Sequence, residues 1–373
     1  MTRYDVAVLG AGILGASAAW RLAEAGASVV LLEMESRPGY HTTGRSAALY
    51  ETAYGPEIIR RLTLASGPFF DAPPSGFAQT PLLAPRGTLF VAAKARSGDV
   101  DRALADALPG TVREISRAEA LRRCPVLNPD WLDRAIANDD AQDMDVASIH
   151  QGYLRGLKAC GGALVCDAGA RTLERQGGLW RIDTPAGRFE AATLVNAAGA
   201  WADEVAGMAG LAPAGIVPKR RTAFVFEAPV DPGGWNFVCE IAEDFYFKPE
   251  AGLILASPAD ETPSPPCDAQ PEEIDIAECV ARIEEATTLR MGRIKRKWAG
   301  LRCFAADKCP VVGPEPAEPS FVWLAAPGGY GIMTSPALGE LCASMVLGRA
   351  LPAHLARNGV DPAALSPART RPL

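Results

Sequence analysis

The first thirty residues alternate between apolar runs and small residues in a pattern that predicts a strand, a turn, a helix and a second strand. Residues 4–9 are mostly apolar or aromatic, as expected of a central parallel strand covered on both faces. A helix is predicted over residues 13–25 and another apolar strand over residues 28–32. This order is typical of an α/β fold built on a parallel sheet.

The middle of the chain has a different pattern. Strand-like runs follow one another without helices at 218–226, 237–241, 245–248 and 252–256. Such a succession predicts an antiparallel sheet, in an α+β part of the protein. Helices are predicted over residues 56–66, 101–108, 117–124, 147–160, 274–289 and 337–347. The acidic stretch 136–146 is predicted to be a loop, as are the Pro- and Gly-rich residues 70–85.

The first turn has the chemistry of a dinucleotide-binding site. It reads Gly10-Ala11-Gly12-Ile13-Leu14-Gly15, a G-x-G-x-x-G pattern between strand and helix. The first glycine permits the tight turn, the second lets the backbone approach a pyrophosphate, and the third lets the helix pack on the strand. Glu33 ends the second strand, where an acid binds an adenosine ribose. This agreement favours a Rossmann-like nucleotide site over a structural βαβ unit.

Composition narrows the class of protein. The 373 residues suit two domains or one large α/β unit with an insertion. A net charge of −7 argues against nucleic acid as a partner. The nine cysteines form no C-x-x-C pair, and there are only three histidines, so no metal site is expected. A strand starting at residue 4 and the lack of a membrane-length apolar run predict a cytoplasmic protein.

Four motifs together resemble those of a known family: GAGILG with Glu33, TTGRSAA, WAGLR and GGYGIMTS. The chain resembles the D-amino-acid oxidase-like group of FAD-dependent oxidoreductases, and within it the bacterial D-arginine dehydrogenases. Matching stretches occur in the same order over nearly the full length. The resemblance implies a discontinuous FAD-binding domain, formed by residues 1–82, 142–218 and 303–373. A substrate-binding domain on an antiparallel sheet would comprise residues 83–141 and 219–302.

The resemblance also implies which residues hold FAD. The ADP part would be bound by the first turn and its neighbours, and the flavin by two later loops. The implied cofactor-binding residues are Gly10, Gly12, Leu14, Gly15, Glu33, Thr43, Arg45, Ser46, Ala47, Ala170, Gly329, Tyr330, Gly331, Ile332, Met333 and Thr334. The stretch 325–336 is in any case a Gly-rich loop before a helix, and a helix N-terminus there suits the negative charge of a reduced flavin.

For the substrate, the resemblance implies that Arg302 pairs with a carboxylate. A guanidinium matches a carboxylate bidentately and does not lose its charge. Tyr246 would add a second donor, and Tyr54 and Arg221 would line the pocket. Gly329 is assigned to the catalytic set as well as to the flavin loop.

Four positions depart from the D-arginine dehydrogenase pattern. Leu49 replaces a histidine near the substrate amine, Glu51 replaces a threonine, and Met333 replaces a glutamine. Thr88 stands where an acid faces the substrate guanidinium, so D-arginine is a doubtful substrate, because a buried cation without a counter-charge is costly. Glu51 is either a catalytic acid near the amine, with a pKa raised by burial, or a solvent-facing loop residue.

The expected activity is oxidation of an amino acid, with a D-amino acid as the first choice, to an imino acid that hydrolyses to a 2-oxo acid and ammonia. One alternative is an oxidase or dehydrogenase of glycine, sarcosine or another N-substituted amino acid. Another is an FAD-binding protein without amine turnover. The electron acceptor stays open between oxygen, a quinone and a protein, and the oligomeric state between monomer and homodimer.

Overall fold

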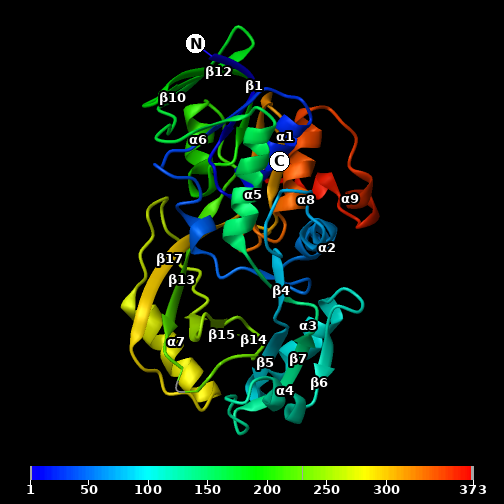
Figure 1. Ribbon diagram of the computed structural model, residues 1–373, viewed down its shortest axis with the longest axis vertical. Coiled ribbons are helices and arrows are strands. Elements are labelled where there is room, and N and C mark those ends of the chain that lie inside the picture. The colour runs from blue at the N-terminus through cyan, green and yellow to red at the C-terminus, as the bar shows by residue number, and fades with distance from the viewer. Residues whose placement is uncertain (1, 229, 371–373) are drawn as a thin grey trace.

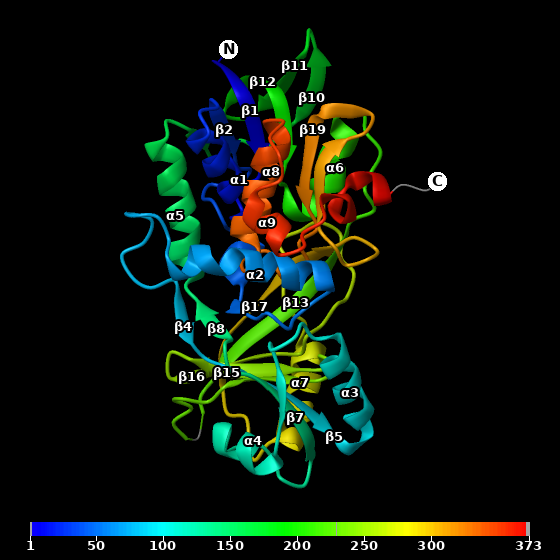
Figure 2. The same cartoon turned by 90° about the vertical axis from the view of Figure 1, so that its right-hand side faces the viewer.

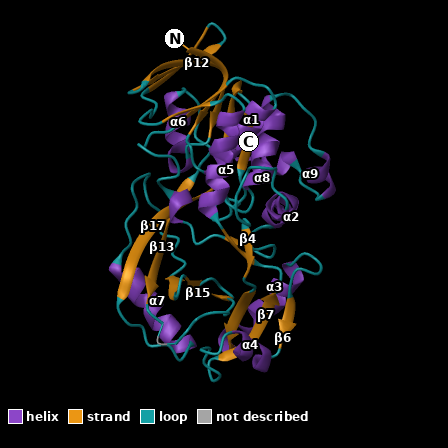
Figure 3. Cartoon of the chain, viewed as in Figure 1, coloured by secondary structure: helices purple, strands orange, loops and turns teal. Residues whose placement is uncertain are grey.

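The computed structural model describes residues 2–228 and 230–370. It has two lobes, the upper one holding both ends of the described chain and the lower one built around a second sheet (Figure 1). Figure 3 shows that helices and strands are mixed in both lobes. The α/β prediction for the chain is confirmed.

The first sheet lies in the upper lobe, and its order is β10-β11-β12-β1-β2-β9 with β19 and β18 beyond β12. Its central strands β12, β1, β2 and β9 run parallel. The run VVLL in β2 is fully buried, since parallel strands covered by helices have no polar face. The strands are β1 (Thr2–Leu9), β2 (Val29–Leu32), β9 (Ala163–Val165), β10 (Thr172–Gln176), β11 (Leu179–Thr184), β12 (Gly187–Asn196), β18 (Val311–Glu315) and β19 (Glu318–Ala325).

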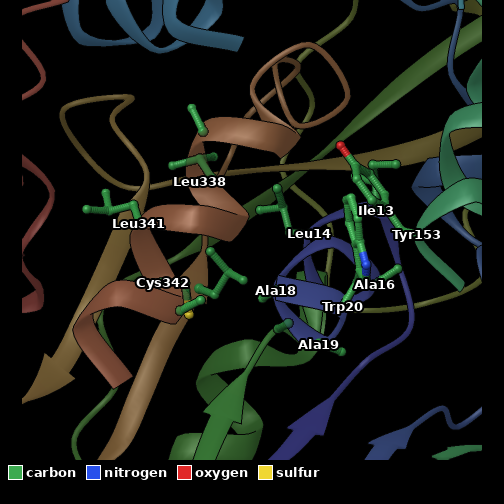
Figure 4. Packing of buried hydrophobic residues seen from close by; sticks show 14 of the residues in the cluster. Ile13, Leu14, Ala16, Ala18, Ala19, Trp20, Tyr153, Leu338, Leu341 and Cys342 are labelled. Carbon is green, nitrogen blue, oxygen red and sulfur yellow. The ribbon is translucent and has the colours of Figure 1, made fainter. Parts of the chain in front are cut away.

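Helices α1 (Ile13–Glu24) and α8 (Ser335–Val346) pack against each other beside this sheet. Leu14 and Ala18 of α1 meet Leu338 and Cys342 of α8 in one buried cluster (Figure 4). The contact is close because α8 presents Gly339, whose Cβ would lie only 2.1 Å from the Ser17 hydroxyl. The cluster holds the first turn of α1 rigidly over the sheet.

The second sheet lies in the lower lobe (Figure 2), in the order β17-β13-β16-β15-β14-β5-β7-β6. Its pairs are antiparallel except β14 with β5, so the prediction of an antiparallel sheet is confirmed. Helix α7 (Glu273–Ala286) covers one face. The strands are β5 (Thr88–Ala93), β6 (Arg113–Ile115), β7 (Leu132–Asn138), β13 (Val217–Phe226), β14 (Phe237–Glu240), β15 (Tyr246–Glu250), β16 (Leu253–Ser257) and β17 (Ile294–Phe304).

Strand pairing sorts the residues of the second sheet onto two faces, because opposite residues share a face and so do residues two apart. Lys219 lies opposite Arg302, and Arg221 lies opposite Gly300. The same face continues through Tyr246, opposite Cys239, to Thr88, opposite Asn138. The other face is apolar and packs under α7 with Phe224, Phe226, Val238, Phe247 and Ile254.

Short elements join the lobes. A small third sheet has the order β3-β8-β4, with β3 (Leu49–Tyr50), β4 (Leu83–Pro85) and β8 (Gln142–Met144). Lys248 of the second sheet bonds Asp143 of β8 at 2.8 Å and ties the two sheets together. The other helices are α2 (Glu57–Asp71), α3 (Ser97–Asp106), α4 (Arg117–Arg123), α5 (Val146–Ala159), α6 (Ala202–Met208) and α9 (Ala353–Arg357).

The loop predictions for residues 136–146 and 70–85 are wrong in part. The stretch 136–146 contains the end of β7 and all of β8, since Asp139 and Asp140 form only a tight turn between them. Helix α2 continues through Gly67 and Pro68 to Asp71, whereas a helix over 56–66 and a loop from residue 70 were predicted. Packing explains the difference, because the ring of Tyr50 lies against Gly67 and leaves no space for a Cβ there.

Candidate active site

The predicted dinucleotide turn is formed as the motif requires. Gly10 has φ of +99°, and a Cβ there would lie 2.5 Å from the carbonyl oxygen of Ala197. A Cβ at Gly15 would lie 1.9 Å from the Gly10 oxygen, so helix and turn touch directly. The N-cap of α1 is Gly12, which offers no capping side chain. The positive end of the helix can therefore face an anion such as a pyrophosphate.

Glu33 lies beside this turn at the end of β2. Its buried carboxylate accepts a hydrogen bond from the Ala11 N–H at 2.8 Å and one from the Glu35 N–H at 3.0 Å. These two bonds hold the acid at the mouth of the turn, where a ribose hydroxyl would bind.

The loop after β2 closes onto the same turn. The Thr43 hydroxyl accepts from the Ile13 N–H at 3.0 Å. The Arg45 guanidinium donates to the backbone oxygens of Ala269 at 3.1 Å and Ala299 at 2.9 Å and pairs with Asp268. Arg45 therefore fastens this loop to β17 and to the loop before α7.

The loop before α8 reaches under the second sheet. Gly329 lies against Arg302, and a Cβ there would be 2.7 Å from the guanidinium carbon. Tyr330, Met333 and Thr334 are buried in the core next to α8. A side chain at position 329 would displace the Arg302 guanidinium, so this loop and the predicted carboxylate site are in direct contact.

One cavity joins these parts. It is lined by most of the predicted residues: Gly10, Gly12, Leu14, Glu33, Thr43, Arg45, Ser46, Ala47, Ala170, Arg221, Tyr246, Arg302, Gly329, Gly331 and Ile332. Six other predicted residues are described by the structure but do not line this cavity: Gly15, Glu51, Tyr54, Tyr330, Met333 and Thr334. The turn at Ala197–Ala200 also lines the cavity. A continuous channel from the Gly-rich turn to the second sheet fits an extended dinucleotide.

Arg302 stands at the sheet end of the cavity, bonded to a chain of polar groups. Its Nη1 donates to the Tyr54 hydroxyl at 3.3 Å, and that hydroxyl donates to Glu243 at 2.9 Å. Burial raises the pKa of Tyr54 well above its ordinary value, and the Glu243 charge adds to the effect. Tyr54 thus stays a neutral hydroxyl that links Arg302 to the Glu243 carboxylate.

Arg221 lines the cavity from the neighbouring strand β13. Its Nε donates to the Asp260 backbone oxygen at 2.9 Å, and its Nη2 contacts Glu261 at 3.4 Å. Its Nη1 is buried without a hydrogen-bond partner. The structure therefore brings two guanidinium groups to one cavity.

Tyr246 lies between these arginines and an aromatic wall. Its ring is stacked on Phe237 with centroids 5.3 Å apart, and both belong to a cluster with Cys239, Leu255 and Val225. The side chain of Ala47, in the loop after β2, packs against the same cluster. The cavity end is therefore polar at the arginines and apolar elsewhere.

Glu51 is buried behind this wall. One carboxylate oxygen accepts from the Ala53 N–H at 2.8 Å and from the Asn138 amide, and the other has no partner. The Thr88 hydroxyl beside it is also buried without a partner. Burial raises the pKa of Glu51, although the hydrogen bonds from the Ala53 N–H and the Asn138 amide act in the opposite direction. The solvent-facing alternative is wrong, and a role at the substrate amine stays a prediction.

Sequence reasoning missed Glu243, Glu261 and the loop that carries Asp260. Glu243 has φ of +62°, a strained left-handed conformation for a residue with a side chain. Its place in a two-strand turn had no motif to mark it. Glu261 lies in the Pro-rich stretch 257–271, which carries no recognisable motif.

The remaining groups add no second chemistry. All nine cysteines are free thiols, five of them buried. Within residues 2–228 and 230–370, no group of His, Cys, Asp or Glu is arranged to hold a metal ion. No helix in these same ranges is long and apolar enough to span a bilayer.

Comparison with known proteins agrees with this architecture. The family model described as DAO, FAD dependent oxidoreductase, matches residues 5–345. The glycine oxidase of Bacillus licheniformis is 25% identical over 365 aligned residues, covering 93% of this chain and 94% of that protein. The human mitochondrial dimethylglycine dehydrogenase is 23% identical over 92% of this chain but only 42% of its own length. The chain thus spans less than half of that relative.

A solved structure shows the same fold. The glycine oxidase of Geobacillus kaustophilus superposes with a TM-score of 0.84 at 21% identity, covering 98% of both chains. At this identity the likeness establishes the fold alone. The narrower resemblance to D-arginine dehydrogenase stays a prediction, because the relatives found are of the glycine oxidase and dimethylglycine dehydrogenase kind.

Proposed function

The chain belongs to the DAO family of FAD-dependent oxidoreductases, and we propose from that premise that it oxidises the C–N bond of a small amino acid. The observation that carries the proposal is the position of Arg302. Its guanidinium lies on Gly329 of the loop that would hold the flavin, and it lines the same cavity as the dinucleotide turn. A carboxylate bound there is held next to the cofactor.

FAD, when bound, supplies the acceptor for the hydride equivalent that leaves the substrate carbon. Gly10, Gly12 and Glu33 would hold its ADP part, and Gly329, Gly331 and Ile332 its flavin end. Arg302 binds the substrate carboxylate with its free N–H donors, because a guanidinium fork matches a carboxylate. Although burial acts to lower the pKa of Arg302, Tyr54, Tyr246 and Glu243 raise it overall, so the cation persists at any working pH.

Tyr246 and the aromatic wall orient the rest of the substrate, and Tyr54 acts on it only through Arg302. Tyr54 holds Arg302 on one side through its hydroxyl. Tyr246 lines the cavity and its ring is stacked on Phe237. The carboxylate bound by Arg302 and the apolar wall around Tyr246 hold the substrate, exclude water and align its C–H bond. This alignment supplies much of the rate in such reactions. The imino acid then hydrolyses to a 2-oxo acid, with release of ammonia from a primary amino acid or of the substituted amine from an N-substituted one.

Glycine, sarcosine or another N-substituted amino acid is the favoured substrate class, ahead of D-amino acids in general. Relatives named glycine oxidase and dimethylglycine dehydrogenase support this order. Thr88 in place of an acid gives no counter-charge for a distal guanidinium, and burial raises the pKa of the neighbouring Glu51 carboxyl. D-Arginine is therefore disfavoured.

The division into domains follows from the sheets and is part of the proposal. The first sheet takes its strands from residues 2–32, 163–196 and 311–325, and the second sheet from 88–138 and 217–304. This supports a cofactor domain of 1–82, 142–218 and 303–373 and a substrate domain of 83–141 and 219–302. A cytoplasmic location is proposed on the sequence argument alone.

An anaerobic titration tests the function. The FAD-loaded protein is mixed with glycine, sarcosine, D-alanine, L-proline or D-arginine, and the flavin absorbance is followed. We expect glycine or sarcosine to bleach the flavin and D-arginine to do so least. Failure of every amine to bleach the flavin would contradict the proposal and favour an FAD-binding protein without amine turnover.

A further inference from the structure

We propose that Arg221 forms a second anion site beside Arg302, so that the substrate is an amine carrying two carboxylates. The inference rests on the proposed function, because it names the substrate class of the same site. The chemistry that fits is an amino dicarboxylate or an amine with an acid group on each nitrogen substituent.

The register of the second sheet places three cations side by side. Lys219 lies directly opposite Arg302, and Arg221 is two residues further along the same strand, on the same face. Like charges at opposite or diagonal positions of an antiparallel pair destabilise the sheet. Such a cluster is stable only where anions neutralise it.

The protein itself leaves Arg221 partly unpaired. The residue is 7% exposed, so its charge is removed from bulk water. Nε and Nη2 are used by the Asp260 backbone oxygen and by Glu261, whereas the buried Nη1 has no partner. A buried donor without an acceptor destabilises the fold, and more so when it is charged. An acceptor on a ligand would remove this cost.

Glu261 does not supply the missing acceptor, because it serves three cations at once. Its carboxylate lies 2.9 Å from the Lys219 amine, 3.4 Å from Arg221 and 3.6 Å from the Lys308 amine. Burial acts to raise the pKa of Glu261, but these cations lower it overall, so it is already ionised. The neighbouring Asp260 carboxylate is held by Arg220 and Thr222.

The two guanidinium groups are anchored to different parts of the chain. Arg302 is held through Tyr54 toward Glu243, in the turn between β14 and β15. Arg221 is held toward residues 260–261, beyond the end of β16. A single planar carboxylate that fills the Arg302 fork therefore leaves Arg221 Nη1 without an acceptor. A second carboxylate on the same ligand satisfies it.

Two inert ethers test the second site. Methoxyacetate carries one carboxylate, and oxydiacetate carries two on the same ether skeleton. Each is titrated into the FAD-loaded protein, and binding is read from the change in the flavin absorbance spectrum. We expect oxydiacetate to bind at least about tenfold more tightly, as one additional charge-assisted hydrogen-bonded contact predicts. Equal dissociation constants for the two ethers would overturn the proposal.

Variants test whether Arg221 causes the preference for oxydiacetate over methoxyacetate. Arg221→Gln should abolish the preference for oxydiacetate and change the methoxyacetate constant less than about twofold. Arg302→Gln should weaken both ethers. Lys308→Gln removes an exposed cation that shares Glu261, and as the matched control it should keep the preference. If Arg221→Gln weakens methoxyacetate as much as oxydiacetate, the two arginines share one carboxylate and the inference is wrong.

Bleaching by amines separates this inference from the proposed function. If sarcosine bleaches the flavin but the two ethers bind equally, the function stands and the second anion site falls. If oxydiacetate is preferred but neither sarcosine nor iminodiacetate bleaches the flavin, the second anion site is supported and the proposed amine oxidation is contradicted. If Arg221→Gln does not retain FAD, the comparison of the two ethers in the wild type still tests the proposal. Arg221→Lys provides a second variant, and it should keep only part of the preference for oxydiacetate.

Discussion

The two faces of the second sheet differ in what their residues do. The face under α7 buries aromatic and aliphatic side chains such as Phe224, Phe226 and Phe247 in one cluster. The opposite face carries Arg221, Arg302 and Tyr246 into the cavity. Successive side chains of a strand point to opposite faces, so the two sets of residues are separated along the same strands. Phe247, for example, directly follows Tyr246. One sheet thus supplies a core and a binding surface, and substitutions on the two faces should have separable effects.

The largest expected effect is on stability, from the α7 face. Phe247→Ala removes a fully buried ring that packs beside Phe245, with ring centroids 6.4 Å apart. Such truncations cost about 3–5 kcal/mol of unfolding free energy. Denaturant unfolding of the FAD-loaded protein measures the loss, and the KM of the remaining folded enzyme should not change.

Phe247→Leu is the control, with a smaller loss because most of the volume is kept. A raised KM in either variant at unchanged stability would show that the two faces are not separable.

The next effect is on substrate binding, from the cavity face. Arg302→Ala should raise KM by on the order of 10²-fold, because a substrate carboxylate loses a desolvated, charge-assisted partner. FAD content should stay unchanged, since the dinucleotide turn is formed by other residues. Steady-state kinetics with sarcosine and the flavin absorbance of the purified variant provide the two readouts.

Arg302→Lys keeps the charge but not the fork, and should recover only part of the affinity. Unchanged kinetics in Arg302→Ala would remove the carboxylate assignment.

A smaller effect is expected from the polar chain behind Arg302. Tyr54→Phe removes the hydroxyl that accepts from Arg302 and donates to Glu243. KM should rise about tenfold, as expected for loss of a hydrogen bond to a charged group. Glu243→Gln keeps an acceptor for Tyr54 and should have a weaker effect. If both variants match the wild type, Arg302 does not depend on this chain for its position.

The smallest effect concerns Glu51, and it depends on pH. Burial raises the pKa of Glu51 in the folded protein above its unfolded value of about 4.3. Its contribution to stability is therefore present at low pH and lost as pH rises through the folded pKa. Glu51→Gln keeps the acceptor for Ala53 and Asn138 and cannot ionise. The melting temperature of the variant relative to wild type should be higher at pH 8 than at pH 4.5.

Kinetics of the same Glu51→Gln variant address its predicted role at the amine. A changed pH profile of kcat/KM would support that role. A melting-temperature difference that is the same at both pH values would contradict the neutral, buried carboxyl.

The two regions also differ in how far the sequence predicts them. The dinucleotide turn is local, so Gly10, Gly12, Gly15 and Glu33 were identified from spacing alone, and the structure puts them together. The substrate face joins strands far apart in sequence. Arg302 and Arg221 needed the family resemblance, and Glu243 and Glu261 had no local signal. Contacts made by tertiary pairing leave no periodic mark in the chain.

Secondary structure followed the same division. The strongly periodic helix α1 and strand β2 were placed within one or two residues. The strands β7 and β8 were missed because Asp139 and Asp140 made a tight turn resemble a long acidic loop. Helix α2 was cut short at Gly67, where contact with Tyr50 favours a glycine inside the helix.

The most direct test of the account compares an amino acid with the same amine lacking its carboxylate. Sarcosine and dimethylamine differ only in the group that Arg302 would bind. Under anaerobic conditions, the account predicts that sarcosine bleaches the flavin of the wild-type protein far faster than dimethylamine, and that Arg302→Ala removes the difference. Equal bleaching rates for the two amines in the wild type would contradict it.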